Sequence, residues 1–364
     1  MKPKKLLVLS NMYPSKEALT FGIFVKNQVN ALREQGLEVD VVAVQNPNMG
    51  KANVLKKYGK WALQTAGNLL TKGRSYDAVH AHYVFPTGML ALLYKKLFKC
   101  RMIITAHGGD IDKMAKKSPR IRKWTAKILK EADHVIAVGN ELYEEIHGSF
   151  HVPKEKLSII NMGVNREVFK PTDQAVAREK LDLSQNEHIF LFVGNLIKQK
   201  GLMELVQAYE KLPKDNKRLI LMGATKDVRF REELETYIKD HNVGNVDILE
   251  PRAQQEVALW MSAADAFVLP SHIEGFGLVA LEAMSCHTPV VGTNVGGLRY
   301  LLNEDSGILV EPQNVSSLFE GMNKVLTDVS SREQLISNGE KRAQENDQQT
   351  LIRKVINVYS PLGG

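Results

Sequence analysis

Two segments of this chain combine glycines with charged side chains in a way that suits a phosphorylated ligand. Residues 194–201 read GNLIKQKG, and residues 274–282 read EGFGLVALE. In the first segment glycine lets the backbone approach a ligand, and Lys200 stands at the expected start of a helix, where unpaired amides attract anions. The segment is neither a P-loop (GxxxxGK[ST]) nor GxGxxG. It predicts a diphosphate site, and the alternative for Lys200 is a solvated lysine in front of a helix.

The second segment carries the more specific chemistry, because it places two carboxylates around a helix start. Gly275 and Gly277 open a loop, and the helix is expected to begin near Gly277, so that its amides face negative charge. Glu274 in the loop can accept hydrogen bonds from sugar hydroxyls. Glu282 lies more than one turn inside an apolar helix, so its carboxylate needs a partner. A ribose diol would serve, and the alternative is a structural salt bridge.

The elements that must position these loops are short apolar runs alternating with amphipathic stretches. Most runs are nearly continuous Val, Ile and Leu, as expected for parallel strands covered by helices on both faces. The predicted fold class is therefore α/β with parallel sheets. The expected strands are residues 5–10, 39–44, 77–80, 102–106, 134–138, 157–161, 189–194, 218–223, 266–270, 289–292 and 307–310.

This alternation restarts in the middle of the chain, after a loop-like break at residues 163–171 (GVNREVFKP). A length of 364 residues also suits two domains. We predict two Rossmann-like, doubly wound domains, residues 1–163 and 164–346, with a C-terminal helix in 347–364 that packs back onto the first. Ligands of such sheets bind beyond the carboxyl ends of the strands, where both segments stand.

The charge of the chain is unevenly distributed. The net charge is +7, yet residues 1–165 carry +13 and the remainder −6. This asymmetry indicates that the first half meets an anionic partner, such as a membrane surface or a phospholipid-linked acceptor. Ordinary solubilising lysines are the alternative. Nucleic acid is not an expected partner, because no RNP-like or zinc-finger pattern is present.

Cysteine usage and hydropathy indicate the compartment. Cys100 and Cys286 fit no metal or disulfide spacing, and Cys286 is expected to be a small packed residue. No apolar run approaches the length of about 18 residues that a membrane-spanning helix needs. We therefore expect a cytoplasmic protein, with peripheral attachment to the inner face of the membrane as a further hypothesis.

The stretch 113–130 (KMAKKSPRIRKWTAKILK) holds eight basic residues and no acidic one. Ser118 is expected to cap a helix with Pro119 at its first position. Ile121, Trp124 and Ile128 follow a helical spacing and are expected to face the core. The basic side chains would then form an exposed surface for anionic lipid or a phospholipid-linked acceptor, together with lysines 51, 56, 57 and 60. We call the following six residues the basic surface: Lys113, Lys116, Lys117, Arg120, Arg122 and Lys123.

EGFGLVALE resembles the paired-glutamate signature of retaining glycosyltransferase family 4, whose members have the GT-B fold of two Rossmann-like domains facing across a cleft. GNLIKQKG is similar to the donor-phosphate motif of that family, and residues 295–297 and 306–312 resemble other parts of its C-terminal domain. Residues 161–171 resemble its interdomain linker. Residues 11–14 and 22–28 are similar to bacterial enzymes of cell-surface polysaccharide synthesis, of the teichuronic-acid type.

The resemblance implies roles for individual residues. His107, in a His-Gly-x-Asp element, would face the donor sugar, although a histidine at a strand end is otherwise more often structural. Glu274 would bind sugar hydroxyls, Lys200 the diphosphate and Glu282 the ribose. The remaining donor contacts, several of them through the backbone, would come from Gly22, Gly194, Asn195, Arg252, Gly275, Phe276, Gly277, Leu278 and Val279.

Asn195 departs from the family pattern, which has arginine there, so one phosphate-binding cation is missing. The resemblance also implies catalysis without a metal or a bound cofactor. It implies transfer of a hexose or N-acetylhexosamine with retention of configuration, with a UDP-sugar as the preferred donor. The acceptor would be a hydroxyl of a lipid-linked or cell-envelope glycan. The alternatives are a sugar-nucleotide epimerase or a phosphorylase on the same fold, and a non-catalytic sugar-nucleotide or glycan-binding protein.

Overall fold

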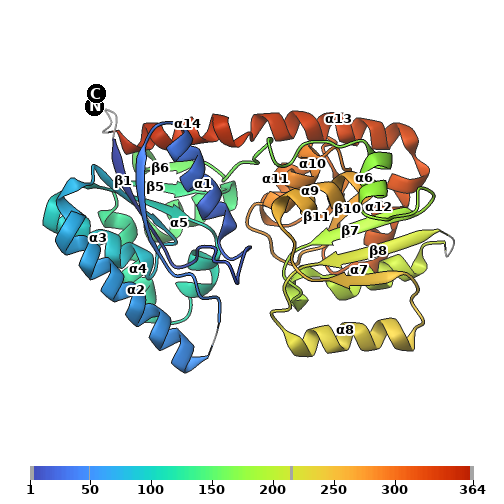
Figure 1. The fold of residues 1–364 in the computed structure, drawn as a ribbon, viewed down its shortest axis with the longest axis horizontal. Coiled ribbons are helices and arrows are strands. Elements are labelled where there is room, and N and C mark those ends of the chain that lie inside the picture. The colour runs from blue at the N-terminus through green and yellow to red at the C-terminus, as the bar shows by residue number, and fades with distance from the viewer. Residues whose placement is uncertain (1–3, 49, 214–215, 361–364) are drawn as a thin grey trace. The chain divides into compact units, whose positions relative to one another are not determined.

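A computed structural model describes residues 4–48, 50–213 and 216–360 of the chain (Figure 1). The described residues form two compact units, one of residues up to 162 together with the C-terminal helix, and one of residues 163–347. Each unit contains a six-stranded parallel sheet with helices on both faces. The predicted α/β fold class with two doubly wound parallel sheets is confirmed. Residues 361–364 of the predicted C-terminal segment lie outside the described residues.

The first sheet has the strand order β2-β1-β3-β4-β5-β6. Right-handed crossovers put α1 on one face and the later helices on the other, and α14 returns to pack on α1 and β4 (Figure 1). The strands are β1 (Lys5–Ser10), β2 (Glu38–Ala43), β3 (Ala78–His82), β4 (Arg101–Ala106), β5 (His134–Ala137) and β6 (Leu157–Ile159). The helices are α1 (Ile23–Glu34), α2 (Lys51–Lys72), α3 (Thr87–Phe98), α4 (Pro119–Glu131), α5 (Asn140–Phe150) and α14 (Gln348–Tyr359), with short turns η1 (Gly73–Ser75), η2 (Asp110–Met114, a π-helix) and η3 (Lys154–Lys156).

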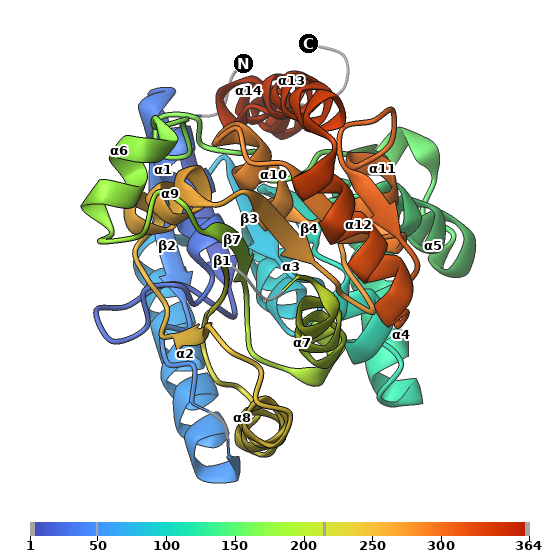
Figure 2. The same cartoon turned by 90° about the vertical axis from the view of Figure 1, so that its right-hand side faces the viewer.

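The second sheet has the order β12-β11-β10-β7-β8-β9. In both views α9 and α10 lie on one side of β7, and α7 and α8 lie on the other (Figures 1 and 2). The strands are β7 (His188–Val193), β8 (Lys217–Met222), β9 (Val246–Leu249), β10 (Ala266–Leu269), β11 (Val290–Thr293) and β12 (Ile308–Val310). The helices are α6 (Gln174–Lys180), η4 (Lys198–Lys200), α7 (Leu202–Lys211), α8 (Val228–Asp240), α9 (Gln254–Ala263), α10 (Leu278–Ser285), α11 (Gly296–Leu301), α12 (Val315–Thr327) and α13 (Val329–Glu345).

Strand β9 is the one strand of the described residues that the sequence patterns did not predict. Its four residues are only partly buried, and Asp247 in its middle accepts a 2.6 Å hydrogen bond from Nε of Arg218 on β8. An edge strand covered on one side has no continuous apolar run, so it lacks the signal of the central strands. By contrast, Phe190, Phe192 and Phe267 of the central strands are fully buried.

Candidate active site

The second sheet has a topological switch point between β7 and β10. These strands are neighbours, and the connections that follow them leave in opposite directions along the sheet. In such sheets ligands bind at the carboxyl ends of the two strands. The loop after β7 leads to Lys200 and the loop after β10 leads to Glu274, so the strand order brings together two segments that are distant in sequence.

Lys200 and Glu274 form a salt bridge at this edge. The ammonium Nζ of Lys200 lies 2.7 Å from Oε2 of Glu274, with side chains 21% and 16% exposed. Ser271 donates its hydroxyl to the same Oε2 at 3.3 Å, and the amide of Gly275 donates to Oε1 at 3.1 Å. Both carboxylate oxygens therefore have donors, which fixes the orientation of Glu274.

The two loops are held against each other by close backbone contacts. Gly201 has φ +68°, and a Cβ there would lie 2.0 Å from the carbonyl oxygen of Pro270, so only glycine fits. On the other side of Lys200, the amide of His272 donates to the carbonyl of Gln199 at 2.9 Å. Lys200 is thus placed between two attachments to the loop that carries Glu274.

A second glycine fixes the backbone of Glu274 itself. Gly296 has φ +47°, and a Cβ there would lie 1.9 Å from the carbonyl oxygen of Glu274. The amide of Gly297 donates to the same oxygen at 3.3 Å. The start of α11 therefore packs directly on the loop, and any residue larger than glycine at position 296 would displace Glu274.

Helix α10 begins where the sequence predicted, directly after Gly277. No side chain caps it, and among the described residues the amides of Leu278 and Val279 have no hydrogen-bond acceptor. Unsatisfied amides at a helix start carry partial positive charge. The start of α10 can therefore receive an anionic group next to Lys200 and Glu274.

Glu282 lies one turn further along α10, and its side chain is partly buried. Burial raises the pKa of its carboxyl group to about 8. None of the salt bridges of the described residues includes Glu282, so the structural ion pair considered as an alternative is not formed there. A partly buried carboxylate without a protein partner is costly to ionise, and a ligand that donates hydrogen bonds to it would lower that cost.

The other predicted donor contacts lie on neighbouring strand ends. Gly194 and Asn195 follow β7 directly, and Asn195 is exposed. Arg252 follows β9, and its Nε lies 3.4 Å from Oε1 of Glu256. Phe276 is partly buried against the core, within the same loop as Gly275. These positions agree with the strand-end rule, while their roles in binding stay predictions.

His107 lies in the first unit, at the carboxyl end of β4. Its Nε2 is 3.0 Å from Nδ1 of His82, and burial lowers the pKa of His107 to about 3. Its ring packs against Phe24 of α1, with centroids 4.9 Å apart. Gly22 is the N-cap of the same helix, so the structure places Gly22 and His107 at one edge of the first sheet.

Sequence reasoning gave no individual role to two polar residues near these groups, Asp110 and His272. Asp110 accepts hydrogen bonds from the amides of His107 at 3.1 Å and Val84 at 2.9 Å, and burial raises its pKa to about 6. In the second unit, Nε2 of His272 lies 2.9 Å from Oε1 of Glu204. The strand-end rule could have singled out both, because each follows a predicted strand within a few residues.

All six residues of the basic surface are exposed, and none forms a salt bridge within the part of the chain that the structure describes. The predicted cap is confirmed, since Ser118 accepts from the amide of Ile121 at 3.3 Å with Pro119 at the first position. The predicted stripe is partly wrong. Ile128 is buried, but Trp124 is 38% exposed, because Thr125 and Leu129 take the buried side of the helix. The ammonium group of Lys127 lies over the Trp124 ring.

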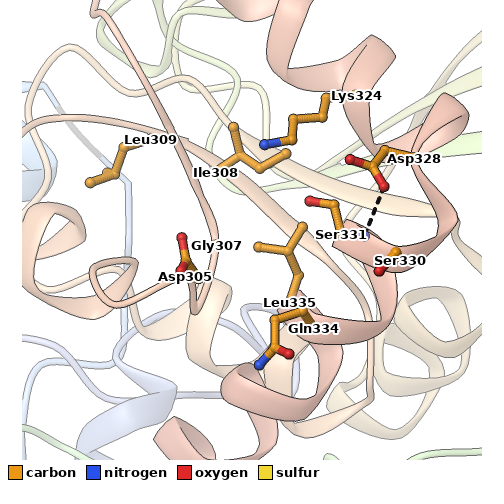
Figure 3. A pocket seen from close by; sticks show the side chains of 10 residues that line it. All are labelled: Asp305, Gly307, Ile308, Leu309, Lys324, Asp328, Ser330, Ser331, Gln334 and Leu335. Carbon is orange, nitrogen blue, oxygen red and sulfur yellow. Dashed lines mark hydrogen bonds between the residues drawn. The ribbon is translucent and has the colours of Figure 1, made fainter.

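A cavity of about 550 Å³ lies elsewhere in the second unit, at the beginning of β12 between α12 and α13 (Figure 3). Lys324, Asp328 and Gln334 contribute polar groups to it. It contains none of the predicted site residues, and the start of a parallel strand is the edge opposite to the switch point.

Within the described ranges, no three His, Cys, Asp or Glu side chains are grouped to hold a metal ion. No helix there is long and apolar enough to cross a membrane.

Comparison with known proteins gives matches along most of the chain. The family described as "Glycosyl transferases group 1" matches residues 159–342, and "Glycosyltransferase Family 4" matches residues 22–168. The uncharacterized glycosyltransferase MJ1607 of Methanocaldococcus jannaschii is 27% identical over 98% of this chain and 97% of its own. TuaC of Bacillus subtilis, assigned to teichuronic acid biosynthesis as a glycosyltransferase, is 26% identical over 88% of each chain.

Solved structures show the same fold. Sucrose-phosphate synthase from Thermosynechococcus elongatus has a TM-score of 0.82 at 24% identity, covering 98% of each chain. The Anabaena protein HepE in complex with UDP and glucose has a TM-score of 0.80 at 20% identity, covering 99% of this chain and 100% of that one. The fold of two parallel sheets flanked by helices is therefore shared with proteins of low sequence identity.

Proposed function

The chain belongs to the glycosyl transferases group 1 family, and we propose that it transfers a hexose or N-acetylhexosamine, with retention, from a UDP-sugar to a hydroxyl acceptor. The acceptor would be a lipid-linked or cell-envelope glycan. The observation that carries this proposal is the salt bridge of Lys200 with Glu274 beside the uncapped start of α10. A positive group and free amides next to a fixed carboxylate suit a diphosphate joined to a sugar.

In this proposal each group binds one part of the donor. Lys200 and the amides of Leu278 and Val279 would stabilise the charge that develops on the leaving diphosphate. Glu274 would accept hydrogen bonds from sugar hydroxyls and hold the sugar in place. Glu282 would accept hydrogen bonds from the ribose diol. Its partly buried carboxylate, which has no salt bridge within the described residues, favours this role. The family resemblance also gives His107 a contact with the donor sugar.

The reaction itself needs few protein groups. The acceptor hydroxyl would attack the anomeric carbon from the face that the diphosphate leaves, so the configuration is retained. One carbon–oxygen bond forms as the bond to the diphosphate breaks, and the hydroxyl proton passes to the leaving phosphate oxygen. This route requires neither a metal nor a protein nucleophile, in agreement with what the family resemblance implies.

The test is transfer and hydrolysis across a panel of UDP- and GDP-sugars, with lipid-linked acceptors present. Release of nucleoside diphosphate from one donor, lost in Glu274→Ala, would support the proposal and identify the donor. Glu320→Ala is the matched control, because Glu320 is an exposed glutamate on α12 of the same unit. Release of an altered sugar nucleotide without acceptor would instead indicate an epimerase. Binding without turnover would indicate a non-catalytic binding protein.

We also propose that the first unit attaches to an anionic bilayer. The basic surface supports this, and α2 on the same face of the sheet adds a second observation (Figure 1). This 22-residue helix contains five lysines and no acidic residue. Leu55, Leu63 and Leu70, spaced by eight and seven residues, are 78%, 76% and 86% exposed. An apolar stripe flanked by lysines suits the interface of a negatively charged membrane.

Vesicle binding tests this attachment. Charge reversal of Lys116, Lys117, Arg120 and Lys123 should abolish binding to vesicles with anionic lipid and leave the weak binding to neutral vesicles unchanged. The control reverses four exposed lysines of the second unit, at positions 211, 239, 324 and 341. Unchanged binding of the first variant would refute the role of the basic surface. A dimer that forms through the α2 leucines, detected by sedimentation, would refute a membrane role for that helix.

A further inference from the structure

Three histidine rings stack at the carboxyl edge of the first sheet. His80 and His82, two residues apart on β3, have centroids 4.6 Å apart and an interplanar angle of 25°. His82 and His107 are 5.3 Å apart at 26°. Phe24 and Tyr83 pack on the outer ring, with centroids 4.9 Å and 4.7 Å from that of His107. The rings are therefore held in fixed orientations.

The innermost ring of this stack is fully satisfied. Nδ1 of His80 lies 2.7 Å from the hydroxyl of Tyr359 on α14, and Nε2 lies 2.7 Å from Oγ1 of Thr105. Burial and the neighbouring His82 lower the pKa of His80 well below its ordinary value. His80 is thus a neutral ring in a fixed position, and His82 stacks on it.

A single hydrogen bond joins the other two rings, those of His82 and His107. Nδ1 of His82 lies 3.0 Å from Nε2 of His107. Nε2 of His82 is buried and has no hydrogen-bond partner among the described residues. Nδ1 of His107 also lacks a partner in the described part of the chain, but it is not among the buried atoms, so solvent or a ligand can reach it. Burial lowers the pKa of both rings, so each carries one ring hydrogen.

These contacts decide which nitrogen carries that hydrogen. If His107 donated from Nε2, His82 would have to carry its hydrogen on Nε2, where no acceptor is available. A buried N–H without an acceptor is rarer in proteins than a buried acceptor without a donor. If His82 donates from Nδ1 instead, His107 accepts at Nε2 and its hydrogen stands on Nδ1. The second arrangement leaves no buried N–H unpaired in this contact.

We propose that His82 is a positioning residue that holds His107 as the Nδ1–H tautomer, so that its accessible nitrogen is a hydrogen-bond donor. His107 then binds an oxygen of the ligand, either a sugar hydroxyl oxygen or a phosphate oxygen. It does not act as the base that removes the proton of the acceptor hydroxyl. The consequence for transfer rests on the proposed function, whereas the tautomer itself does not.

The tautomer can be read directly in the ligand-free, full-length protein. Two-bond ¹H–¹⁵N spectra of ring nitrogens, at neutral pH and with ¹⁵N-histidine labelling, distinguish a protonated from a bare nitrogen. The His107 signals are assigned by their loss in His107→Phe. We expect a protonated Nδ1 and a bare Nε2. A wild-type spectrum with the proton on Nε2 would overturn the proposal whatever the activity of the protein.

Two variants of His82 separate positioning from packing. His82→Asn keeps an N–H donor near the place of Nδ1, so it should keep the tautomer of His107 and most of the transfer rate. His82→Phe keeps a flat ring for stacking but loses the donor. It should make the Nε2–H tautomer the major form of His107 and lower kcat/KM about tenfold, which corresponds to the loss of one hydrogen bond. Adding His107→Phe to His82→Phe should cause little further loss.

The outcomes distinguish this inference from the proposed function. If the spectra show the expected tautomer but the protein turns over no sugar nucleotide, His82 remains a positioning residue and the proposed glycosyltransferase activity is refuted. Transfer that is equally slow in His82→Asn and His82→Phe, with His107 unchanged in both, would refute the positioning role. The wild-type and His82→Asn spectra suffice to decide the tautomer if His82→Phe does not fold.

Discussion

The ammonium group of Lys200 lies 2.7 Å from the carboxylate of Glu274, although 74 residues separate them in the chain. The strand order around β7 and β10 creates this contact. In the ligand-free protein each residue neutralises the other, so the pair is pre-positioned without an isolated charge. A bound diphosphate would share Lys200 with Glu274, while Glu274 keeps its hydrogen bonds from Ser271 and Gly275.

Replacing Lys200 should remove most of the transition-state stabilisation of the diphosphate. We expect Lys200→Met to lower kcat by about 10²- to 10³-fold, as for the loss of one preorganised charge-stabilising donor. The measurement is steady-state transfer with the identified donor. Lys198→Met is the matched control, because Lys198 is an exposed lysine in the same turn η4. An equal loss in both variants would mean that the general charge of this turn, and not the placement of Lys200, matters.

Donor affinity should depend on pH through Glu282. Its pKa is raised to about 8 in the ligand-free protein, and hydrogen bonds from a ribose diol favour the ionised form and lower that pKa. When the pH is below the ligand-free pKa of Glu282, donor binding then releases a proton. The affinity for the donor should therefore rise between about pH 6 and about pH 8. Calorimetry in buffers of different ionisation enthalpy measures the proton release. Glu282→Gln should bind weakly and release none, and proton release that persists in it would contradict the assignment.

The same residue should lower stability at alkaline pH. The folded-state pKa of Glu282 lies above its unfolded value of 4.5, so the folded state holds the proton more tightly. Stability is therefore lost as pH rises from the unfolded pKa through the folded one. We expect Glu282→Gln to raise the Tm more at about pH 9 than at about pH 5. A Tm gain that is equal at both values would show that the carboxyl group does not titrate in this window.

Gly296 should be required for the geometry of Glu274. In Gly296→Ala the new Cβ meets the Glu274 carbonyl oxygen at 1.9 Å in a left-handed backbone conformation, so the loop must move. We expect a loss of about 1–3 kcal/mol of stability and a large fall in kcat, measured by thermal unfolding and transfer assays. Gly148→Ala on α5 is the control, since a Cβ there meets nothing within 4 Å. Normal activity in Gly296→Ala would mean that Glu274 need not keep its position.

Restoring the cation that family members carry at position 195 should strengthen donor binding. Asn195 is exposed at the end of β7, so an arginine has room there. A charge-assisted hydrogen bond to the diphosphate would lower the KM for the donor up to about tenfold. Asn195→Gln controls for side-chain length without charge. If Asn195→Arg leaves KM unchanged, another basic group already occupies the place of the missing cation.

Local patterns identified most of the fold and the segments that bear the chemistry. Continuous apolar runs predicted eleven strands, all of which the structure contains with ends shifted by a few residues. The start of α10 after Gly277 and the cap at Ser118 were also predicted, because such signals lie within a few neighbouring residues. Strand β9 and the exposure of Trp124 were not predicted. Both depend on which parts of the chain pack beside them, and local sequence patterns do not contain that information.

The sequence by itself determined which residue types stand at the strand ends, because a strand and the loop that follows it are contiguous in the chain. Only the tertiary structure decided which of these ends meet. The order of the strands pairs Lys200 with Glu274 and His82 with His107, and the packing around α10 gives Glu282 no salt bridge within the described residues. Apolar runs make every central strand look alike, so they contain no information on strand order, and the contacts between distant loops follow from that order.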